Sequence, residues 1–108
     1  MDGVATTHYS EVTLADLLTV RDLVTAHFLP YGAKIILFGS FARGDADRAS
    51  DIDVAVDAPG GLPVELFAEL SEKLEASSIL RTVDLIDLRN ADASLRQRVK
   101  SEGIVWQP

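Results

Sequence analysis

The sequence lacks cysteine altogether, and aromatic residues make up only 6% of its 108 residues. The absence of cysteine excludes disulfide bridges, thiolate zinc sites and cysteine nucleophiles, and it is more typical of cytosolic than of secreted proteins. Hydrophobic runs are short, since none approaches the roughly 18 residues of a membrane-spanning helix. The N-terminal Met1-Asp2-Gly3 has neither the basic nor the apolar part of a signal peptide. We therefore expect a cytoplasmic protein without a membrane segment.

Basic residues are the minority charge. Lys and Arg number 10 against 17 Asp and Glu, which gives a formal net charge of −7. Proteins that bind nucleic acid through its phosphate backbone are usually basic, so we expect no direct nucleic-acid binding. Hydrophobic residues still make up 47% of the chain, which is enough to build the core of one small domain.

Hydrophobic periodicity predicts alternating helices and strands. After a polar lead-in over residues 1–12, Thr13 resembles a helix N-cap, and Pro30-Tyr31-Gly32 ends the helix that follows. The other predicted elements are a strand over 34–38, a helical turn over 41–43, a strand over 51–56, a helix over 63–76 with Pro63 in its first position, a strand over 82–88, and a helix capped by Asn90 and ended by Gly103. This order predicts an α/β (α+β) fold, with a small mixed sheet of three to four strands flanked by helices. We expect a single domain over residues 13–108.

Two connections and the C-terminal segment affect the topology. The helix over 63–76 is long enough to be a crossover between parallel strands, whereas the link between the first two strands fits either parallel or antiparallel neighbours. Ile104-Val105-Trp106 forms a short apolar tail. Packing of this tail on a partner protein is one interpretation of its apolar character.

The second predicted strand carries two carboxylates on one face. Asp51 and Asp53 are two residues apart, so both side chains point the same way, about 6–7 Å apart along the strand. Two like charges this close repel each other unless a cation lies between them. Two Mg²⁺ ions on such carboxylates, about 3.5–4 Å apart, can hold the attacking and leaving oxygens of a displacement at phosphorus. The alternative is a solvated edge-strand face.

A third carboxylate is expected from the neighbouring strand, about 4.8 Å away. Asp84 and Asp87 are both candidates. Asp84 is preferred because Val83 and Leu85 would then pack inward. However, Ile86 breaks the alternation, so periodicity alone leaves the choice open.

Gly39 and Ser40 form the predicted phosphate-binding end of the site. A glycine after a buried strand lets the backbone approach a phosphate closely, N–H groups of the following turn point at that phosphate, and the Ser40 hydroxyl adds a donor. Arg43 lies one helical turn further on, and it either contacts the same phosphates or pairs with an aspartate of the following loop. Ser50 either contacts the nucleotide or, more in keeping with its place in the loop, braces the turn before the strand.

The segments Gly39-Ser40, Ala42-Arg43-Gly44 and Ser50-Asp51-Ile52-Asp53 together resemble the signature of the minimal nucleotidyltransferases. These proteins belong to the DNA-polymerase-β-like nucleotidyltransferase superfamily. The Thr82-Val83-Asp84-Leu85 segment stands where that family places its third carboxylate. The resemblance implies a nucleotidyltransferase fold and a transfer of AMP from ATP to a hydroxyl group, with two Mg²⁺ ions as cofactors.

The resemblance also implies roles for individual residues. Asp51 and Asp53 would hold the metal ions, Asp84 would hold one of them and help to activate the acceptor, and Gly39 and Ser40 would bind the β- and γ-phosphates. Members of this size are commonly the antitoxin of a two-gene pair whose toxin is a HEPN ribonuclease.

The expected function is therefore that of an antitoxin. It would adenylylate a tyrosine of the HEPN toxin within a hetero-oligomer. The alternatives are an antitoxin that masks the toxin by binding alone, and a subunit of a small-molecule nucleotidyltransferase.

Overall fold

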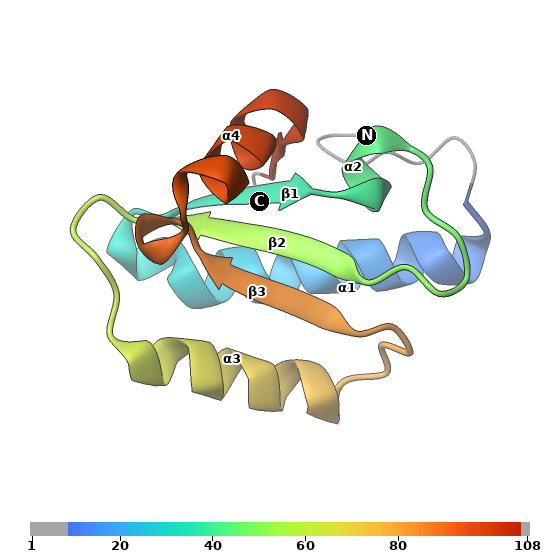
Figure 1. Ribbon diagram of the computed structural model, residues 1–108. Coiled ribbons are helices and arrows are strands. Elements are labelled where there is room, and N and C mark those ends of the chain that lie inside the picture. The colour runs from blue at the N-terminus through green and yellow to red at the C-terminus, as the bar shows by residue number, and fades with distance from the viewer. Residues whose placement is uncertain (1–8, 107–108) are drawn as a thin grey trace.

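The structure is a computed structural model that describes residues 9–106. Within this range helices and strands alternate along the chain (Figure 1). In order they are α1 (Glu11–Phe28), β1 (Lys34–Phe38), α2 (Ser40–Arg43), β2 (Ile52–Asp57), α3 (Val64–Ala76), β3 (Val83–Asp87), α4 (Ala93–Glu102) and β4 (Ile104–Trp106). Single turns of 3-10 helix follow α1 (Leu29–Tyr31) and β3 (Leu88–Asn90). The predicted α/β fold class is confirmed.

The four strands form one mixed sheet in the order β3-β2-β1-β4. β1 is antiparallel to both β2 and β4, whereas β2 and β3 are parallel. Helix α3 is therefore the crossover expected between parallel strands. The link from β1 to β2, which the sequence left open, joins antiparallel neighbours. The C-terminal end of β1 and the N-terminal ends of β2 and β3 consequently lie side by side at one end of the strands.

The first helix begins earlier than predicted. Its N-cap is Ser10, whose hydroxyl accepts a hydrogen bond from the backbone N–H of Thr13 at 3.2 Å. The prediction of Thr13 as the cap was wrong because two hydroxyl residues stand three positions apart and either can cap a helix. Residues 1–8 of the predicted lead-in lie outside the described residues. At the other end, Gly32 adopts a left-handed conformation with φ of 64°, which ends the helical segment.

Other boundaries also differ from the prediction, and β3 is one residue shorter at each end than the predicted strand over 82–88. Asp92, not Asn90, caps α4, because its carboxylate accepts from the N–H of Leu95 at 2.8 Å. Asn90 instead lies in the preceding 3-10 turn and donates to Asp87. Pro63 is the N-cap residue of α3 rather than its first residue, and β2 begins one residue later than predicted.

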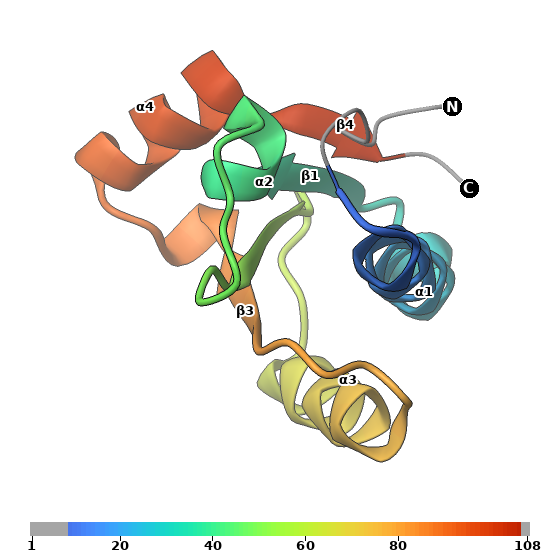
Figure 2. The same ribbon diagram turned by 90° about the vertical axis from the view of Figure 1, so that its right-hand side faces the viewer.

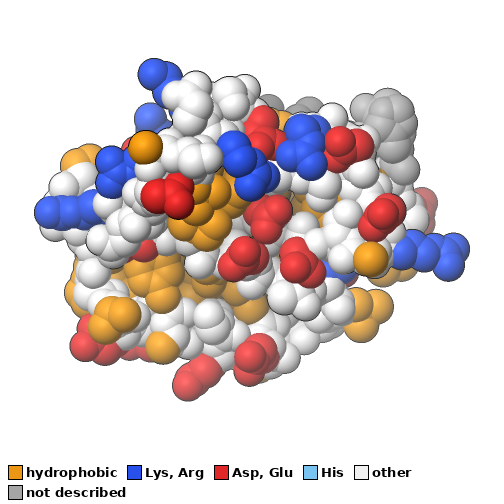
Figure 3. All heavy atoms as spheres, in the orientation of Figure 1, with side chains coloured by type: hydrophobic (Ala, Val, Ile, Leu, Met, Phe, Trp, Pro, Cys, Tyr) orange, Lys and Arg blue, Asp and Glu red, His pale blue; other side chains and the backbone are white. Residues whose placement is uncertain are grey.

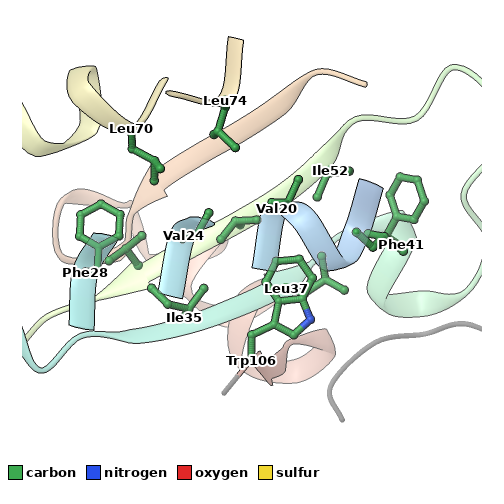
Figure 4. Packing of buried hydrophobic residues seen from close by; sticks show 13 residues of the cluster. Val20, Val24, Phe28, Ile35, Leu37, Phe41, Ile52, Leu70, Leu74 and Trp106 are labelled. Atoms are coloured by element: carbon green, nitrogen blue, oxygen red, sulfur yellow. The ribbon is translucent and has the colours of Figure 1, made fainter. Parts of the chain in front are cut away.

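The main hydrophobic core lies between the sheet and the helices α1 and α3 (Figures 2 and 4). From β2, the side chains of Ile52, Val54 and Val56 enter this core with no exposed surface. The other buried members are Leu17, Val20, Val24, Phe28, Ile35, Leu37, Phe41, Leu70, Leu74 and Trp106. This face of the sheet carries most of the apolar burial that stabilises the fold.

A smaller apolar cluster lies on the opposite face, beneath α4. It consists of Ile36, Phe38, Ala55 and Val99. This helix covers only part of the face, so the remaining part is left for polar side chains (Figure 2).

The predicted apolar tail is β4, and it completes the sheet. Trp106 is only 1% exposed and belongs to the main core. Packing of the tail on a partner was therefore the wrong interpretation of its apolar character, since the segment is used inside the domain. Among the described residues, no helix combines the length and apolar character that crossing a bilayer requires.

Candidate functional site

Acidic side chains gather on the partly covered face of the sheet. In the parallel register Asp53 of β2 is the partner of Asp84 of β3, so the two side chains stand next to each other on one face. Asp53 is half-buried and Asp84 is exposed. Asp51 precedes β2 by one residue and is exposed on the same side. Figure 3 shows acidic side chains grouped at the centre of this face.

The structure also separates Asp84 from Asp87. Val83 and Leu85 pack against the main core, as the choice of Asp84 requires. Ile86, which disturbed the alternation, packs against the smaller cluster on the other face. Asp87 accepts hydrogen bonds from the N–H of Arg89 and the amide of Asn90, so it caps the turn that follows β3. The geometry therefore brings Asp84, and not Asp87, next to Asp53.

Gly39 brings the loop after β1 against Asp53. Its backbone has φ of 75° and ψ of −157°, a combination that residues with a side chain rarely adopt. A Cβ atom at this position would overlap Oδ2 of Asp53. Position 39 therefore requires glycine for two reasons, its backbone angles and the lack of space for a side chain. Gly39 places the start of α2 directly beside the carboxylates.

Ser40 is the first residue of α2. The first N–H groups of a helix have no acceptor within the helix. In α2 these are the N–H groups of Ser40 and Phe41, which lie just beyond the C-terminal end of β1. The Ser40 hydroxyl forms no hydrogen bond within residues 9–106. Gly39 thus lies against Asp53, and Ser40 follows it at the start of α2.

Burial, together with electrostatic repulsion, disfavours the ionised form of Asp53. Burial raises the pKa of its carboxyl above the ordinary value, and the negative charges of Asp84 and Asp51 raise it further. The positive charge of Arg98 acts in the opposite direction on the same pKa. The site is therefore a concentration of negative charge that a bound cation would stabilise.

The donor set fits a hard divalent cation. The three side chains supply only carboxylate oxygens, which are the ligands that Mg²⁺ prefers, and adjacent strands place two of them about 4.8 Å apart. As the side chains stand, no three Asp, Glu or His residues in the described part of the chain are gathered tightly enough to surround a metal ion. The backbone positions of Asp53 and Asp84 are nevertheless in register on neighbouring strands.

Arg43 is held by two carboxylates. Its Nη1 donates to Oε2 of Glu102 at 2.6 Å, and its Nε donates to Oδ2 of Asp45 at 3.2 Å. These bonds raise the pKa of its guanidinium. Of the two roles considered for Arg43, the structure shows pairing with a carboxylate of the following loop and, in addition, a link from α2 to the end of α4.

Ser50 braces the loop before β2. Its hydroxyl accepts from the N–H of Asp47 at 2.9 Å and donates to the carboxylate of the same residue at 3.2 Å. Arg81 adds a second brace, since its Nη1 donates to the carbonyls of Asp47 and Ser50 at 2.9 and 2.8 Å. Its guanidinium also lies 4.9 Å from the centre of the Phe41 ring.

Sequence reasoning missed two of these arginines. Neither Arg81 nor Arg98 belongs to the motif that the sequence shows. Arg81 instead fixes the loop that delivers Asp51, and Arg98 lies close enough to affect the pKa of Asp53. Neither has a sequence signal, because both contacts depend on the packing of segments that are distant along the chain.

Residues 31–106 match the family described as Polymerase beta, Nucleotidyltransferase. The chain belongs to this family. The match includes β1, the Gly39 loop and the strands that carry Asp53 and Asp84. The resemblance that the sequence motif indicated is therefore confirmed.

Curated relatives carry the name protein adenylyltransferase MntA. The chain is 46% identical to the protein from Shewanella oneidensis over 75 residues, which are 69% of this chain and 53% of that protein. It is 32% identical to the protein from Thermococcus cleftensis over 96 residues, covering 84% of this chain and 96% of that protein. The chain thus matches about half the length of the Shewanella relative and nearly all of the Thermococcus one.

Solved structures show the same fold. A minimal nucleotidyltransferase has a TM-score of 0.68 and 31% identity, covering 91% of this chain and 97% of that one. A toxin–antitoxin complex with AMP-PNP has a TM-score of 0.65 and 36% identity, covering 81% and 72% of the two chains. A complex of MNT antitoxin with a tri-AMPylated HEPN toxin from Shewanella oneidensis has a TM-score of 0.62 and 33% identity, covering 89% and 71%. The predicted nucleotidyltransferase fold is confirmed.

Proposed function

We propose that this protein transfers AMP from ATP to a tyrosine hydroxyl of a HEPN ribonuclease toxin and thereby acts as the antitoxin of the pair. The observation that carries this proposal is the register of Asp53 with Asp84 beside the Gly39 loop. The similarity to proteins named protein adenylyltransferase MntA supports the acceptor class. The AMP-PNP and tri-AMPylated toxin complexes support ATP as the donor and a HEPN protein as the partner. With ATP as its substrate, the protein acts in the cytoplasm.

In this proposal two groups of residues bind the nucleotide, one through its phosphates and the other through metal ions. The backbone of Gly39 and Ser40 and the Ser40 hydroxyl bind the β- and γ-phosphates, because N–H donors at the start of a helix favour anions. Asp51, Asp53 and Asp84 would hold two Mg²⁺ ions. When bound, these ions polarise the phosphate oxygens and favour the ionised form of an attached hydroxyl.

The transfer is a displacement at the α-phosphorus. The tyrosine oxygen forms a bond to this phosphorus, and the bond to the oxygen that bridges to the β-phosphate breaks. Pyrophosphate leaves with the electron pair of the broken bond. In this proposal Asp84 accepts the hydroxyl proton, and its exposure to solvent, from which the acceptor approaches, supports that role.

The structure gives less support to the two alternative functions, a masking antitoxin and a small-molecule nucleotidyltransferase. The apolar tail that favoured masking of a partner is paired with β1 as strand β4, and its Trp106 is buried in the main core. A small-molecule acceptor would require an enclosed pocket beside the carboxylates, and four cavities found within residues 9–106 are lined by other residues. A macromolecular acceptor that brings its own hydroxyl into an open site fits this surface better.

The direct test is transfer of label from α-labelled ATP with Mg²⁺ to the HEPN protein encoded beside this gene. We expect label on a tyrosine of the partner and none when Asp53→Ala replaces the wild type. Equal labelling by wild type and Asp53→Ala would overturn the proposal. A stable complex without any labelling would favour the masking antitoxin instead.

A further inference from the structure

We propose that Arg98 of α4 binds the triphosphate of the nucleotide, which is one of the two roles that the sequence left open for Arg43. The inference rests on the proposed function, since it concerns the same nucleotide. It is drawn from the position of the Arg98 guanidinium and from the different partners of the two arginines.

The first observation is where Arg98 lies. Its guanidinium carbon is 6.0 Å from the centre of the Phe38 ring. Phe38 is the β1 residue directly opposite Asp53 in the antiparallel register. Arg98 therefore flanks the acidic face from the side opposite Asp84. Figure 3 shows basic side chains bordering the central acidic group on this face.

The second observation concerns which guanidinium nitrogens of Arg98 and Arg43 already form hydrogen bonds. Arg98 uses its Nε to bond Oε1 of Glu102 at 3.2 Å, while its two terminal nitrogens make no hydrogen bond within the described residues. Its side chain is 53% exposed. Arg43, in contrast, has both its Nε and one terminal nitrogen bound to carboxylates. Arg98 thus presents the part of a guanidinium that binds phosphate oxygens in pairs.

Glu102 holds the two arginines in place. Its side chain is only 15% exposed, with one carboxylate oxygen on Arg43 and the other on Arg98. This shared carboxylate links α2 to α4 and keeps Arg98 over Phe38. We interpret Glu102 as a positioning residue, whereas Arg98 is the residue that contacts the ligand.

The chemical need for such a cation follows from the charge of the site. A nucleoside triphosphate carries several negative charges, and it must approach three carboxylates in a chain whose net charge is −7. In the proposed function the β- and γ-phosphates lie at Gly39 and Ser40, which directly follow Phe38 in the chain. A guanidinium at the rim stabilises these phosphates by charge-assisted hydrogen bonds.

Titration of the full chain with Mg²⁺–AMP-PNP and, separately, with AMP tests this role. We expect Arg98→Gln to weaken AMP-PNP binding about 10- to 100-fold, which is the effect of losing a hydrogen bond to a charged group. AMP binding should be unchanged, because AMP lacks the distal phosphates. Arg98→Lys, which keeps the charge without the paired donors, should fall between wild type and Arg98→Gln.

Lys100→Gln is the matched control. Lys100 lies two residues further along the same helix and lines a separate cavity with Lys34, so its loss changes the net charge equally without reaching the site. We expect it to leave AMP-PNP binding unchanged. If Arg98→Gln weakens AMP-PNP and AMP equally, or weakens neither, the role of Arg98 is wrong while nucleotide binding stands. If the wild type binds no AMP-PNP, the proposed function itself is wrong.

Discussion

The two faces of the sheet differ sharply although they share the same strands. On the face toward α1 and α3, Ile52, Val54 and Val56 of β2 are completely buried. On the other face the same strand presents Asp53, half-buried beside a cluster of only four buried apolar residues. Because successive side chains of a strand point to opposite faces of the sheet, the six residues of β2 contribute to both faces.

This difference separates stability from chemistry. The covered face supplies the apolar burial that keeps the domain folded, whereas the partly open face leaves carboxylates accessible to metal, nucleotide and acceptor. Charges are tolerated there because water still reaches them. Substitutions on the two faces should therefore affect different measurable quantities.

The largest effect is expected from Asp53→Asn. In the proposed site this carboxylate holds a metal ion, so its loss should remove several kcal/mol of transition-state stabilisation and lower AMP transfer about a thousandfold or more. The protein should remain folded, as thermal unfolding can show. Asp57→Asn is the control, since Asp57 lies on the same face of β2 four residues further on and should tolerate the change with little loss of transfer. Comparable losses from both substitutions would contradict the assignment.

Leu37→Ala should have the opposite effect, because it should lower stability and leave AMP transfer unchanged. Leu37 is fully buried in the main core, so its truncation should lower the free energy of unfolding by about 2–5 kcal/mol, as denaturant titration measures. AMP transfer per folded molecule should be unaffected. The exposed Val105 offers a control, since Val105→Ala should change stability by about 0.5 kcal/mol or less. A loss of transfer without a loss of stability in Leu37→Ala would break the separation of the two faces.

Gly39→Ala should affect both quantities. The backbone angles of Gly39 cost an alanine about 1–3 kcal/mol, and the added Cβ displaces the Asp53 carboxylate. Gly32→Ala is the matched control, because Gly32 also has a positive φ but nothing lies within 4 Å of its added Cβ. Both variants should unfold at lower denaturant concentration than wild type, and only Gly39→Ala should lose transfer activity. Full activity in Gly39→Ala would show that the close approach to Asp53 is unimportant.

The smallest effect concerns pH. The folded-state pKa of Asp53 is raised above its unfolded value, so the folded protein binds the proton more tightly. The metal-free protein should therefore lose some stability as pH rises from the unfolded pKa through the raised folded pKa. Asp53→Asn should abolish this part of the pH dependence and give a Tm at pH 7 at least equal to that of wild type. A lower Tm for Asp53→Asn at pH 7 would mean that the carboxylate is stabilised by contacts rather than repelled.

Local patterns predicted much of this architecture. The strand over 34–38 was predicted with its observed bounds because it is a short apolar run between a turn and a glycine. Asp51 and Asp53 were located by strand alternation, and the Gly39 loop by its glycine. These features depend on residues that are close in sequence.

Features that depend on long-range packing were not predictable in this way. The pairing of Ile104–Trp106 with β1 joins segments about 70 residues apart, and three apolar residues do not identify their partner. The ambiguity between Asp84 and Asp87 arose because Ile86 packs in a second small cluster that the sequence does not reveal. Arg98 was missed because only the packing of α4 brings it over Phe38.

The central claim is that Asp51, Asp53 and Asp84 form one metal-dependent nucleotide site on the partly open face. Anomalous diffraction from crystals grown with Mn²⁺ and AMP-PNP tests it most directly, because Mn²⁺ replaces Mg²⁺ on oxygen ligands and is located by its own scattering. The account predicts Mn²⁺ bound by these carboxylates, with the nucleotide phosphates reaching toward Gly39 and Ser40. Mn²⁺ and nucleotide bound elsewhere on the domain, with this face empty, would contradict it.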